Sequence, residues 1–161
     1  MTCLVGLIHS GKVHMGGDSA ASVDNAIEVR TNRKVFRNGA YVIGFTGSFR
    51  VGQLLQYAVI EEPGKDLMAH LVNAVVPVLQ KLAGKETDEI MIGHSGRLFK
   101  ISSDYSVAEY PEYAAAGTGE PWALGRMHGS LGAPEARAVA ALEAAQAHCT
   151  GVRAPFVVEI A

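Results

Sequence analysis

Apolar and β-branched residues alternate with glycine-containing turns in much of this chain, a pattern typical of β-hairpins. The strand pairs predicted from it, with their turns, are residues 2–9 and 12–15 around Ser10-Gly11, 33–37 and 40–46 around Asn38-Gly39, and 88–94 and 97–102 around Ser95-Gly96. Between the first two pairs, residues 19–32 are small and polar, with Ile27 and Val29 as candidate strand contacts. Three hairpins therefore make up most of the predicted sheet structure.

Helical spacing of apolar residues appears after the second hairpin. Ser48 is a candidate N-cap for a helix that runs to Glu62 and is stopped by Pro63-Gly64. A second amphipathic helix is predicted over residues 66–83, ended by Gly84. The remaining predicted elements are strands at residues 106–110, 113–119 and 154–160 and helices at residues 120–129 and 134–149.

Helices and antiparallel strands in separate runs indicate the α+β class. If two sheets are each covered by a pair of helices, the arrangement is a four-layer αββα sandwich. The 161 residues are long enough to bury a sizeable core, and we expect residues 1–161 to form a single domain. The sequence shows no internal repeat or linker.

Composition narrows the classes of partner. Charged residues make up 19% of the chain against 48% hydrophobic, and this low charge favours a surface partly buried against other subunits. The net charge of −2 gives no basic footprint for nucleic acid. The N-terminus lacks the pattern of a signal peptide. Polar residues interrupt the apolar stretch of residues 71–82, so it does not have the pattern of a membrane span. Cys3 and Cys149 form no spacing pattern, which fits a reduced setting. These features predict a cytoplasmic protein without membrane or nucleic-acid partners.

The second residue is the first candidate for chemistry. Removal of Met1 would leave Thr2 with a free α-amine, whose pKa of about 8 lets it accept a proton from the side-chain hydroxyl. A threonine with its own amine is one of the known nucleophile–base pairs. By itself, a Met-Thr start is more typical of an edge strand with a polar first residue.

Three stretches resemble the proteasome β-type family, and more closely its bacterial HslV-like branch. They are TCLVGLIHSGKVHMGGDS at residues 2–19, RTNRKVF around Lys34, and the glycine-rich helix entry GFTGSFRVGQLL. The resemblance covers about the first sixty residues well and the rest in outline. It implies the αββα fold of hydrolases with an N-terminal nucleophile.

The resemblance also implies a set of catalytic roles. Thr2 would be the nucleophile, Lys34 would lower the pKa of its amine and stabilise the attacking oxygen, and Asp18 would hold Lys34 charged. The backbone N–H of Gly47 would be the oxyanion donor. Taken singly, Lys34 fits a solvated strand lysine, Asp18 a turn aspartate, and Gly47 a plain strand-to-helix turn; their order and spacing together are more specific.

The later part of the chain departs from the family pattern. The family carries Gly-Ser-Gly, whose serine bonds the amine of the nucleophile, where this chain has Gly117-Thr118-Gly119; Thr118 keeps the hydroxyl. Residues 147–151 lack the aspartate of the family's Asp-x-x-Ser-Gly stretch, which leaves the orientation of the amine open. The candidate substrate-pocket residues implied by the resemblance are Ser22, Ile27, Phe45 and Phe49. Phe49 would restrict the depth of the pocket.

Motifs of other enzyme classes are absent: the sequence has no GxSxG, Walker, HExxH or CxxC pattern. Its six histidines show no metal-ligand spacing, so we expect no metal and no cofactor. The sequence therefore predicts a threonine endopeptidase that cleaves polypeptides inside a homo-oligomeric ring or stacked rings, with a ring ATPase unfoldase as a candidate partner. The alternatives are a catalytically silent assembly subunit and an amidohydrolase acting on small molecules.

Overall fold

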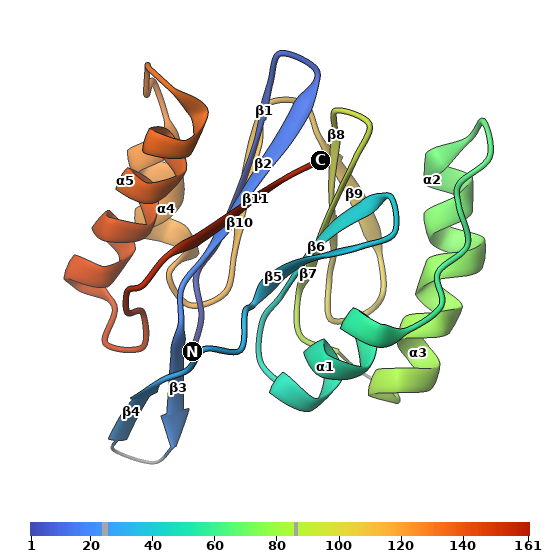
Figure 1. The fold of residues 1–161 in the computed structure, drawn as a ribbon, viewed down its shortest axis with the longest axis horizontal. Coiled ribbons are helices and arrows are strands. Elements are labelled where there is room, and N and C mark those ends of the chain that lie inside the picture. Colours follow the sequence, from blue (N-terminus) through green and yellow to red (C-terminus); the bar gives the residue numbers. More distant parts are fainter. Residues whose placement is uncertain (24–25, 86) are drawn as a thin grey trace.

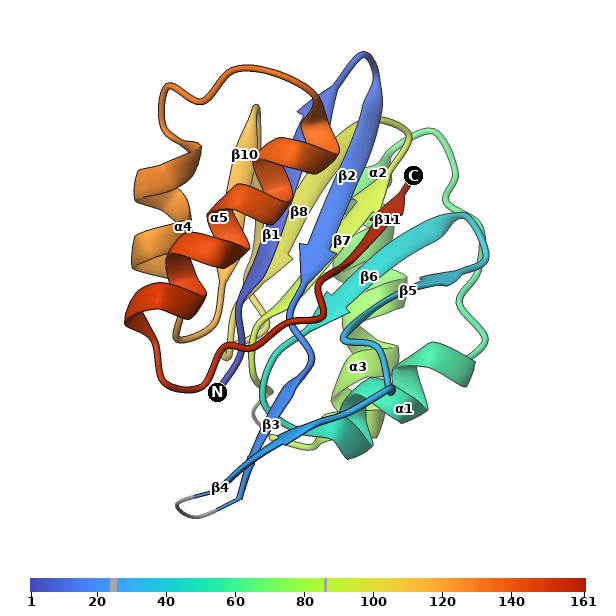
Figure 2. The ribbon, with the colours of Figure 1, turned by 60° about the vertical axis from the view of Figure 1, so that its left-hand side comes forward.

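The chain folds into four layers, two helical and two of β-sheet (Figure 1). The computed structural model describes residues 1–23, 26–85 and 87–161. Helices α4 and α5 cover one sheet, helices α1 to α3 cover the other, and the two sheets face each other between them (Figures 1 and 2). This arrangement confirms the predicted α+β class and the αββα sandwich.

The two main sheets are antiparallel throughout their described pairings. The first has the order β10-β1-β2-β11 and consists of β1 (Leu4–His9), β2 (Lys12–Gly17), β10 (Tyr113–Ala116) and β11 (Val157–Ile160). The second has the order β5-β6-β7-β8-β9 and consists of β5 (Val35–Asn38), β6 (Tyr41–Phe45), β7 (Ile90–His94), β8 (Arg97–Ile101) and β9 (Val107–Tyr110). A separate hairpin pairs β3 (Ala20–Val23) with β4 (Ala26–Val29). The three predicted hairpins all form.

The helices fall into two groups. Those on the second sheet are α1 (Phe49–Tyr57), α2 (Leu67–His70), the π-helical segment η1 (Leu71–Val75) and α3 (Val76–Ala83). Those on the first sheet are α4 (Glu120–Met127) and α5 (Pro134–His148). Local sequence explains several of the starts: Ser48 and Asp66 cap α1 and α2 with their side chains, and Pro134 occupies the first turn of α5.

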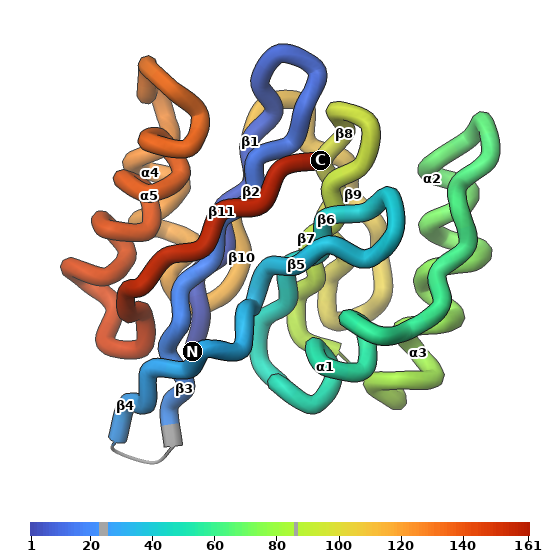
Figure 3. Tube along the Cα trace, in the orientation of Figure 1, coloured from blue at the N-terminus to red at the C-terminus, as the bar shows by residue number. Residues whose placement is uncertain are grey.

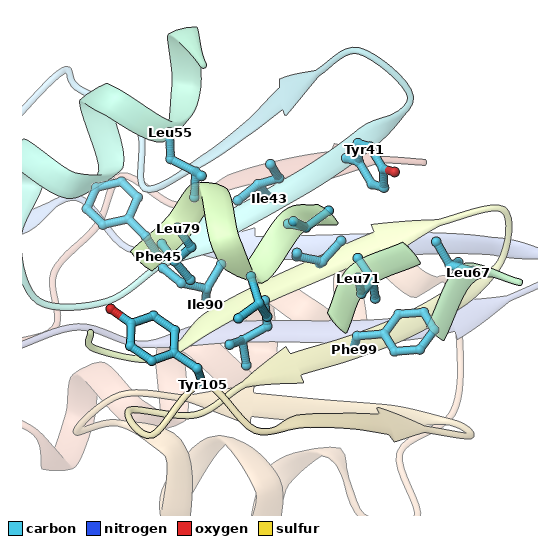
Figure 4. Close-up of a cluster of buried hydrophobic side chains, with 14 of the residues drawn as sticks. Tyr41, Ile43, Phe45, Leu55, Leu67, Leu71, Leu79, Ile90, Phe99 and Tyr105 are labelled. Atoms are coloured by element: carbon cyan, nitrogen blue, oxygen red, sulfur yellow. The ribbon is translucent and has the colours of Figure 1, made fainter. Parts of the chain in front are cut away.

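Three clusters of buried apolar side chains fill the spaces between the layers. One joins the second sheet to α1, α2 and α3 and includes Ile43, Leu55, Leu71 and Phe99 (Figure 4). Another joins the first sheet to α4 and α5, and the third lies between the sheets. The N-terminus lies at the end of the sandwich where the β3–β4 hairpin projects, and the C-terminus lies toward the other end (Figure 3).

Two helix predictions were wrong in detail. The first helix ends at Tyr57 and not at Glu62, because Ala58 adopts an extended backbone while its N–H still bonds the carbonyl of Leu55. Tyr57 and Val59 are exposed, so no packing holds further turns together. The helix predicted over residues 66–83 contains the π-helical segment η1, which ends at Val75, two residues before Pro77. Pro77 has no N–H, which breaks the regular helical hydrogen bonding.

Candidate active site

A tight turn at residues 117–119 holds the backbone of Thr2. The N–H of Thr2 donates to Thr118 Oγ1 at 3.2 Å, and the N–H of Gly119 donates to the carbonyl of Thr2 at 3.1 Å. The hydroxyl of Thr118 also reaches that carbonyl, at 3.3 Å. These bonds replace the pairing of a strand, which explains why β1 begins at Leu4 and not at Thr2. Thr2 is only 3% exposed, so its position is determined by its surroundings.

Lys34 and Asp18 form a buried ion pair beside Thr2. Lys34 directly precedes β5, Asp18 directly follows β2, and Lys34 Nζ lies 2.8 Å from Asp18 Oδ1. The lysine is 2% exposed and the aspartate 1%. Asp18 is also the acceptor for the backbone N–H groups of Cys3 at 3.0 Å, Ala20 at 2.9 Å and Arg153 at 3.3 Å. The aspartate thus anchors both the lysine and the chain segments around it.

Burial and charge act in opposite directions on Lys34. Burial lowers the pKa of Lys34 from its ordinary value of 10.5, and the charge and hydrogen bond of Asp18 oppose that lowering. The sequence left open that Lys34 is a solvated lysine on a strand. Its buried position beside Asp18 does not match that description. A lysine held in this way can place a positive charge next to a reacting oxygen.

Two donors converge on the carbonyl oxygen of Met1. Thr2 Oγ1 donates to this oxygen at 2.8 Å, and Lys34 Nζ approaches it at 3.4 Å. The amino terminus of Met1 donates to Ser22 Oγ at 3.3 Å. The hydroxyl, the ammonium group and the peptide bond between residues 1 and 2 therefore meet at one point.

A pocket of about 420 Å³ opens beside Thr2. Its lining residues are Met1, Thr2, Thr46, Gly47, Thr87, Asp88, Glu89, Ser103, Gly117 and Thr118. Gly47 has φ of +68°, a conformation that favours glycine. A Cβ at Gly47 would lie 1.8 Å from Asp88 Oδ2, so the carboxylate of Asp88 packs directly against the glycine. Three of the predicted catalytic residues, Thr2, Gly47 and Thr118, thus share one cavity wall.

The predicted substrate residues are placed differently from one another. Ser22 lies next to the amino terminus of Met1, and Ile27 is exposed on β4. Phe49 begins α1, with Lys34 Nζ 5.8 Å from the centre of its ring. Phe45 is 3% exposed and belongs to the hydrophobic core. None of these four residues is among those that line the pocket beside Thr2. The Phe45 ring contacts the Phe49 ring edge-on, with 5.6 Å between ring centres.

Sequence reasoning missed two groups near the site. The Sγ atom of Cys149 lies 3.6 Å from Thr118 Oγ1, where its S–H can donate to the hydroxyl that bonds the nitrogen of Thr2. Glu89 lines the pocket and pairs with the buried Lys100 at 3.0 Å. A signal for the second group is present in the sequence, since Lys100 stands in an otherwise apolar stretch of a predicted strand.

Other site types find no support in the described part of the chain. Among residues 1–23, 26–85 and 87–161, no three His, Cys, Asp or Glu side chains gather in a way that could hold a metal ion. Within the same ranges no helix has the length and apolar character that crossing a membrane requires.

Comparison with known proteins identifies the fold. No known family profile matches this sequence. The structure is similar to BPH of Thiobacillus denitrificans, solved alone and in complex with epoxomicin, with a TM-score of 0.83 and 20% identity in both cases. The match covers 99% of this chain and 98% of the BPH chain in the complex, or 97% of the BPH chain solved alone. Eukaryotic HslV from Trypanosoma brucei matches with a TM-score of 0.79 and 17% identity, over 99% of this chain and 98% of that chain. The fold is therefore that of HslV-like proteins.

Proposed function

We propose that this chain, which shares its fold with HslV and BPH, is a threonine peptidase whose nucleophile is Thr2 after removal of Met1. The observation that carries the proposal is the meeting of Thr2 Oγ1 and Lys34 Nζ at a single carbonyl oxygen, that of Met1. The hydroxyl and the ammonium group thus lie together beside an acyl group, where a nucleophile and a cation that stabilises its developing charge are both needed. The proposal treats residues 1–161 as one domain.

The mechanism begins with the loss of Met1, which converts the amide nitrogen of Thr2 into a primary amine. This amine takes the proton of Thr2 Oγ1 while the oxygen attacks the substrate carbonyl. Lys34, kept charged by Asp18, favours the neutral form of the amine and stabilises the developing negative charge on the attacking oxygen. The Gly47 N–H, which donates to no other group in the described ranges, is the proposed donor to the oxyanion.

The second half of the reaction reverses the proton's path. The amine returns its proton to the leaving nitrogen as the C–N bond breaks, which leaves an ester between Thr2 Oγ1 and the acyl group. Water then attacks this ester, with the amine again as base, and releases the acid and the free hydroxyl. Thr118 Oγ1 orients the amine throughout by accepting one of its N–H bonds, as it does with the amide nitrogen at 3.2 Å.

The proposal extends to the assembly and the cellular setting. A nucleophile of broad specificity has to be kept from folded proteins, so we propose a polypeptide substrate and a closed homo-oligomeric ring or stacked rings. The low fraction of charged residues supports buried subunit contacts. A ring ATPase as partner and a cytoplasmic location remain predictions, supported by the likeness to HslV.

The first experiment combines intact mass with cleavage. The purified mature chain should be lighter by one methionine and should cleave small peptide amides, whereas Thr2→Ala should be folded and inactive. Thr2→Ser is the matched variant, because it keeps a hydroxyl on the same amine, and it should retain part of the activity. Epoxomicin, which BPH binds in its complex, should add its mass to the mature wild type and not to Thr2→Ala. A processed chain without cleavage or adduct contradicts the proposal.

One observation favours the silent subunit as a second candidate. Met1 fits the site closely: its amino terminus bonds Ser22, and its side chain packs so tightly against Gly151 that a Cβ there would lie 2.0 Å from Met1 Cβ. Complete retention of Met1 in the intact mass would support this reading. Light scattering tests the alternative that the chain is an amidohydrolase acting on small molecules. A stable, active monomer is the result expected for that alternative.

A further inference from the structure

A second buried lysine lies outside the group formed by Thr2, Asp18 and Lys34. Lys100, in β8, is 8% exposed, and its Nζ has three acceptors: Glu89 Oε1 at 3.0 Å, Glu120 Oε1 at 3.1 Å and the carbonyl of Ala115 at 3.3 Å. An ammonium group has three hydrogens, so its hydrogen-bonding capacity is used in full. We call Lys100, Glu89 and Glu120 the Lys100 cluster.

The Lys100 cluster joins four elements at one place. Glu89 stands directly before β7, Glu120 begins α4, and Ala115 lies in β10, which faces β8 across the two sheets. Lys100 therefore connects the second sheet to both ends of the segment that carries the turn at residues 117–119. Burial alone would lower the pKa of Lys100, but its hydrogen bonds with Glu89 and Glu120 outweigh burial and raise it, so the lysine stays charged at neutral pH.

Glu89 connects this cluster to the nucleophile. Its second oxygen, Oε2, accepts the N–H of Gly117 at 2.8 Å. Gly117 opens the turn whose next two residues bond the nitrogen and the carbonyl of Thr2. The contact is close, because a Cβ at Gly117 would lie 2.5 Å from the Thr2 carbonyl oxygen. A displacement of Glu89 therefore changes the contacts of Thr2 through a single turn of chain.

Packing alone does not explain why charged side chains occupy the position of the Lys100 cluster. A buried ion pair is weak support for stability, since apolar residues of similar volume often serve equally well. The carboxylates of Glu89 and Glu120 are each partly exposed, and Glu89 lines the pocket beside Thr2. The charged group thus lies where it can act on the site and not in the centre of the core.

We infer that Lys100 and Glu89 are positioning residues for the reaction of Thr2: they hold the turn at residues 117–119 so that Thr118 orients the amine. This inference rests on the proposed peptidase function. Neither residue bonds the nucleophile. Their effect passes from Lys100 Nζ to Glu89 and then through the Gly117 N–H to Thr118.

Lys100→Met is the variant that removes the charge and keeps the length of the side chain. We expect kcat to fall by about 100-fold, with KM within about threefold, because a small misplacement of a catalytic group has an effect of this size. Glu89→Gln keeps an oxygen for the Gly117 N–H and should lose less activity than Glu89→Ala. The matched control is Arg97→Met, which removes the exposed bidentate ion pair between Arg97 and Glu109 on the same strand and should leave kcat unchanged.

A second measurement does not depend on cleavage. Hydrogen exchange of the Gly119 amide, whose N–H bonds the Thr2 carbonyl, should speed up by at least about tenfold in Lys100→Met and not in Arg97→Met. The inference is overturned if exchange at Gly119 is unchanged, or if Lys100→Met keeps the wild-type kcat. It is also overturned if Glu89→Gln and Glu89→Ala lose the same activity. An inactive wild type whose Gly119 exchange responds to Lys100→Met would instead contradict the peptidase function and leave the positioning of the turn supported.

Discussion

Replacement of Asp18 by asparagine is the sharpest test of the buried ion pair. The carboxylate of Asp18 has four donors: Lys34 Nζ and the N–H of Cys3 on one oxygen, and the N–H groups of Ala20 and Arg153 on the other. In asparagine an NH₂ group takes the place of one oxygen. The two donors that bonded this oxygen then lose their acceptor and face the NH₂ group, which is itself a donor. Lys34 also loses its negative partner.

The magnitude follows from burial. Removal of one charge from a buried pair costs about 3–5 kcal/mol, because the remaining charge is left without a partner. Each buried N–H without an acceptor adds about 1–3 kcal/mol. Against a typical domain stability of about 5–15 kcal/mol, Asp18→Asn should lower the free energy of unfolding by at least about 3 kcal/mol. Activity should fall with it, since an unpaired Lys34 loses its charge.

The assay is urea unfolding at pH 7 and equal protein concentration, followed by circular dichroism. Glu159→Gln is the control: it removes the partner of Arg33 from an ion pair of 2.6 Å that is partly exposed, and it should cost less than about 1 kcal/mol. Lys34→Met, combined with Asp18→Asn, removes the charge that the single variant leaves unpaired. The double variant should therefore lose less than the sum of the two single variants, by at least about 1 kcal/mol.

Two results would refute this reasoning. The first is an Asp18→Asn variant no less stable than Glu159→Gln, which would mean that the pair is solvated in solution. The second is strict additivity of Asp18→Asn and Lys34→Met, which would mean that the two side chains do not interact.

Three further predictions concern single positions. Burial raises the pKa of the Cys3 thiol from 9.0 to about 12. The contribution of the thiol to stability is therefore complete below about pH 9 and declines, by up to about 4 kcal/mol, as the pH rises toward 12. The difference in unfolding free energy between wild type and Cys3→Ala, measured across this range, should show that decline. Gly47→Ala should abolish cleavage and cost about 1–2 kcal/mol, because alanine is strained at φ of +68° and its Cβ would meet Asp88. Gly151→Ala should lower the melting temperature of a chain that retains Met1 and leave that of the processed chain unchanged, because the new Cβ would lie 2.0 Å from Met1 Cβ.

Each of these three predictions would be contradicted by a specific result. Parallel pH curves for wild type and Cys3→Ala would show that the thiol is not the group that titrates. Cleavage at the wild-type rate by Gly47→Ala would show that the added Cβ does not displace the backbone N–H of residue 47, which alanine keeps. Equal losses for Gly151→Ala in both forms of the chain would mean that Met1 does not pack against this glycine.

The hairpins illustrate what local sequence can predict. Ser10-Gly11, Asn38-Gly39 and Ser95-Gly96 each join two apolar runs, and the glycine of each turn has positive φ. These turns depend on residues next to one another, and so does the side-chain cap of α1 by Ser48. With the hairpins and helices located, the number of layers followed, and the αββα sandwich could be predicted before any contact was known.

The candidate site was predictable only in part. Thr2 was a candidate from its place after Met1, whereas Asp18, Lys34, Gly47 and Thr118 were named through a resemblance. The residues alone left plain structural roles open for several of them. Phe45 shows the limit of this reasoning: the resemblance implied a pocket residue, yet its side chain lies in the core. Lys100 was missed because its partners Glu89 and Glu120 come from other elements.

The sequence by itself determined the elements, their order and the layered fold, because turns, caps and hydrophobic periodicity act between neighbouring residues. Only the tertiary structure decided where the first helix ends, which lysines are buried and what surrounds the hydroxyl of Thr2. Thr2 and Thr118 are 116 positions apart in the chain, and no local pattern encodes their contact. The ionisation of Lys34 likewise depends on the packing that excludes water around it and Asp18.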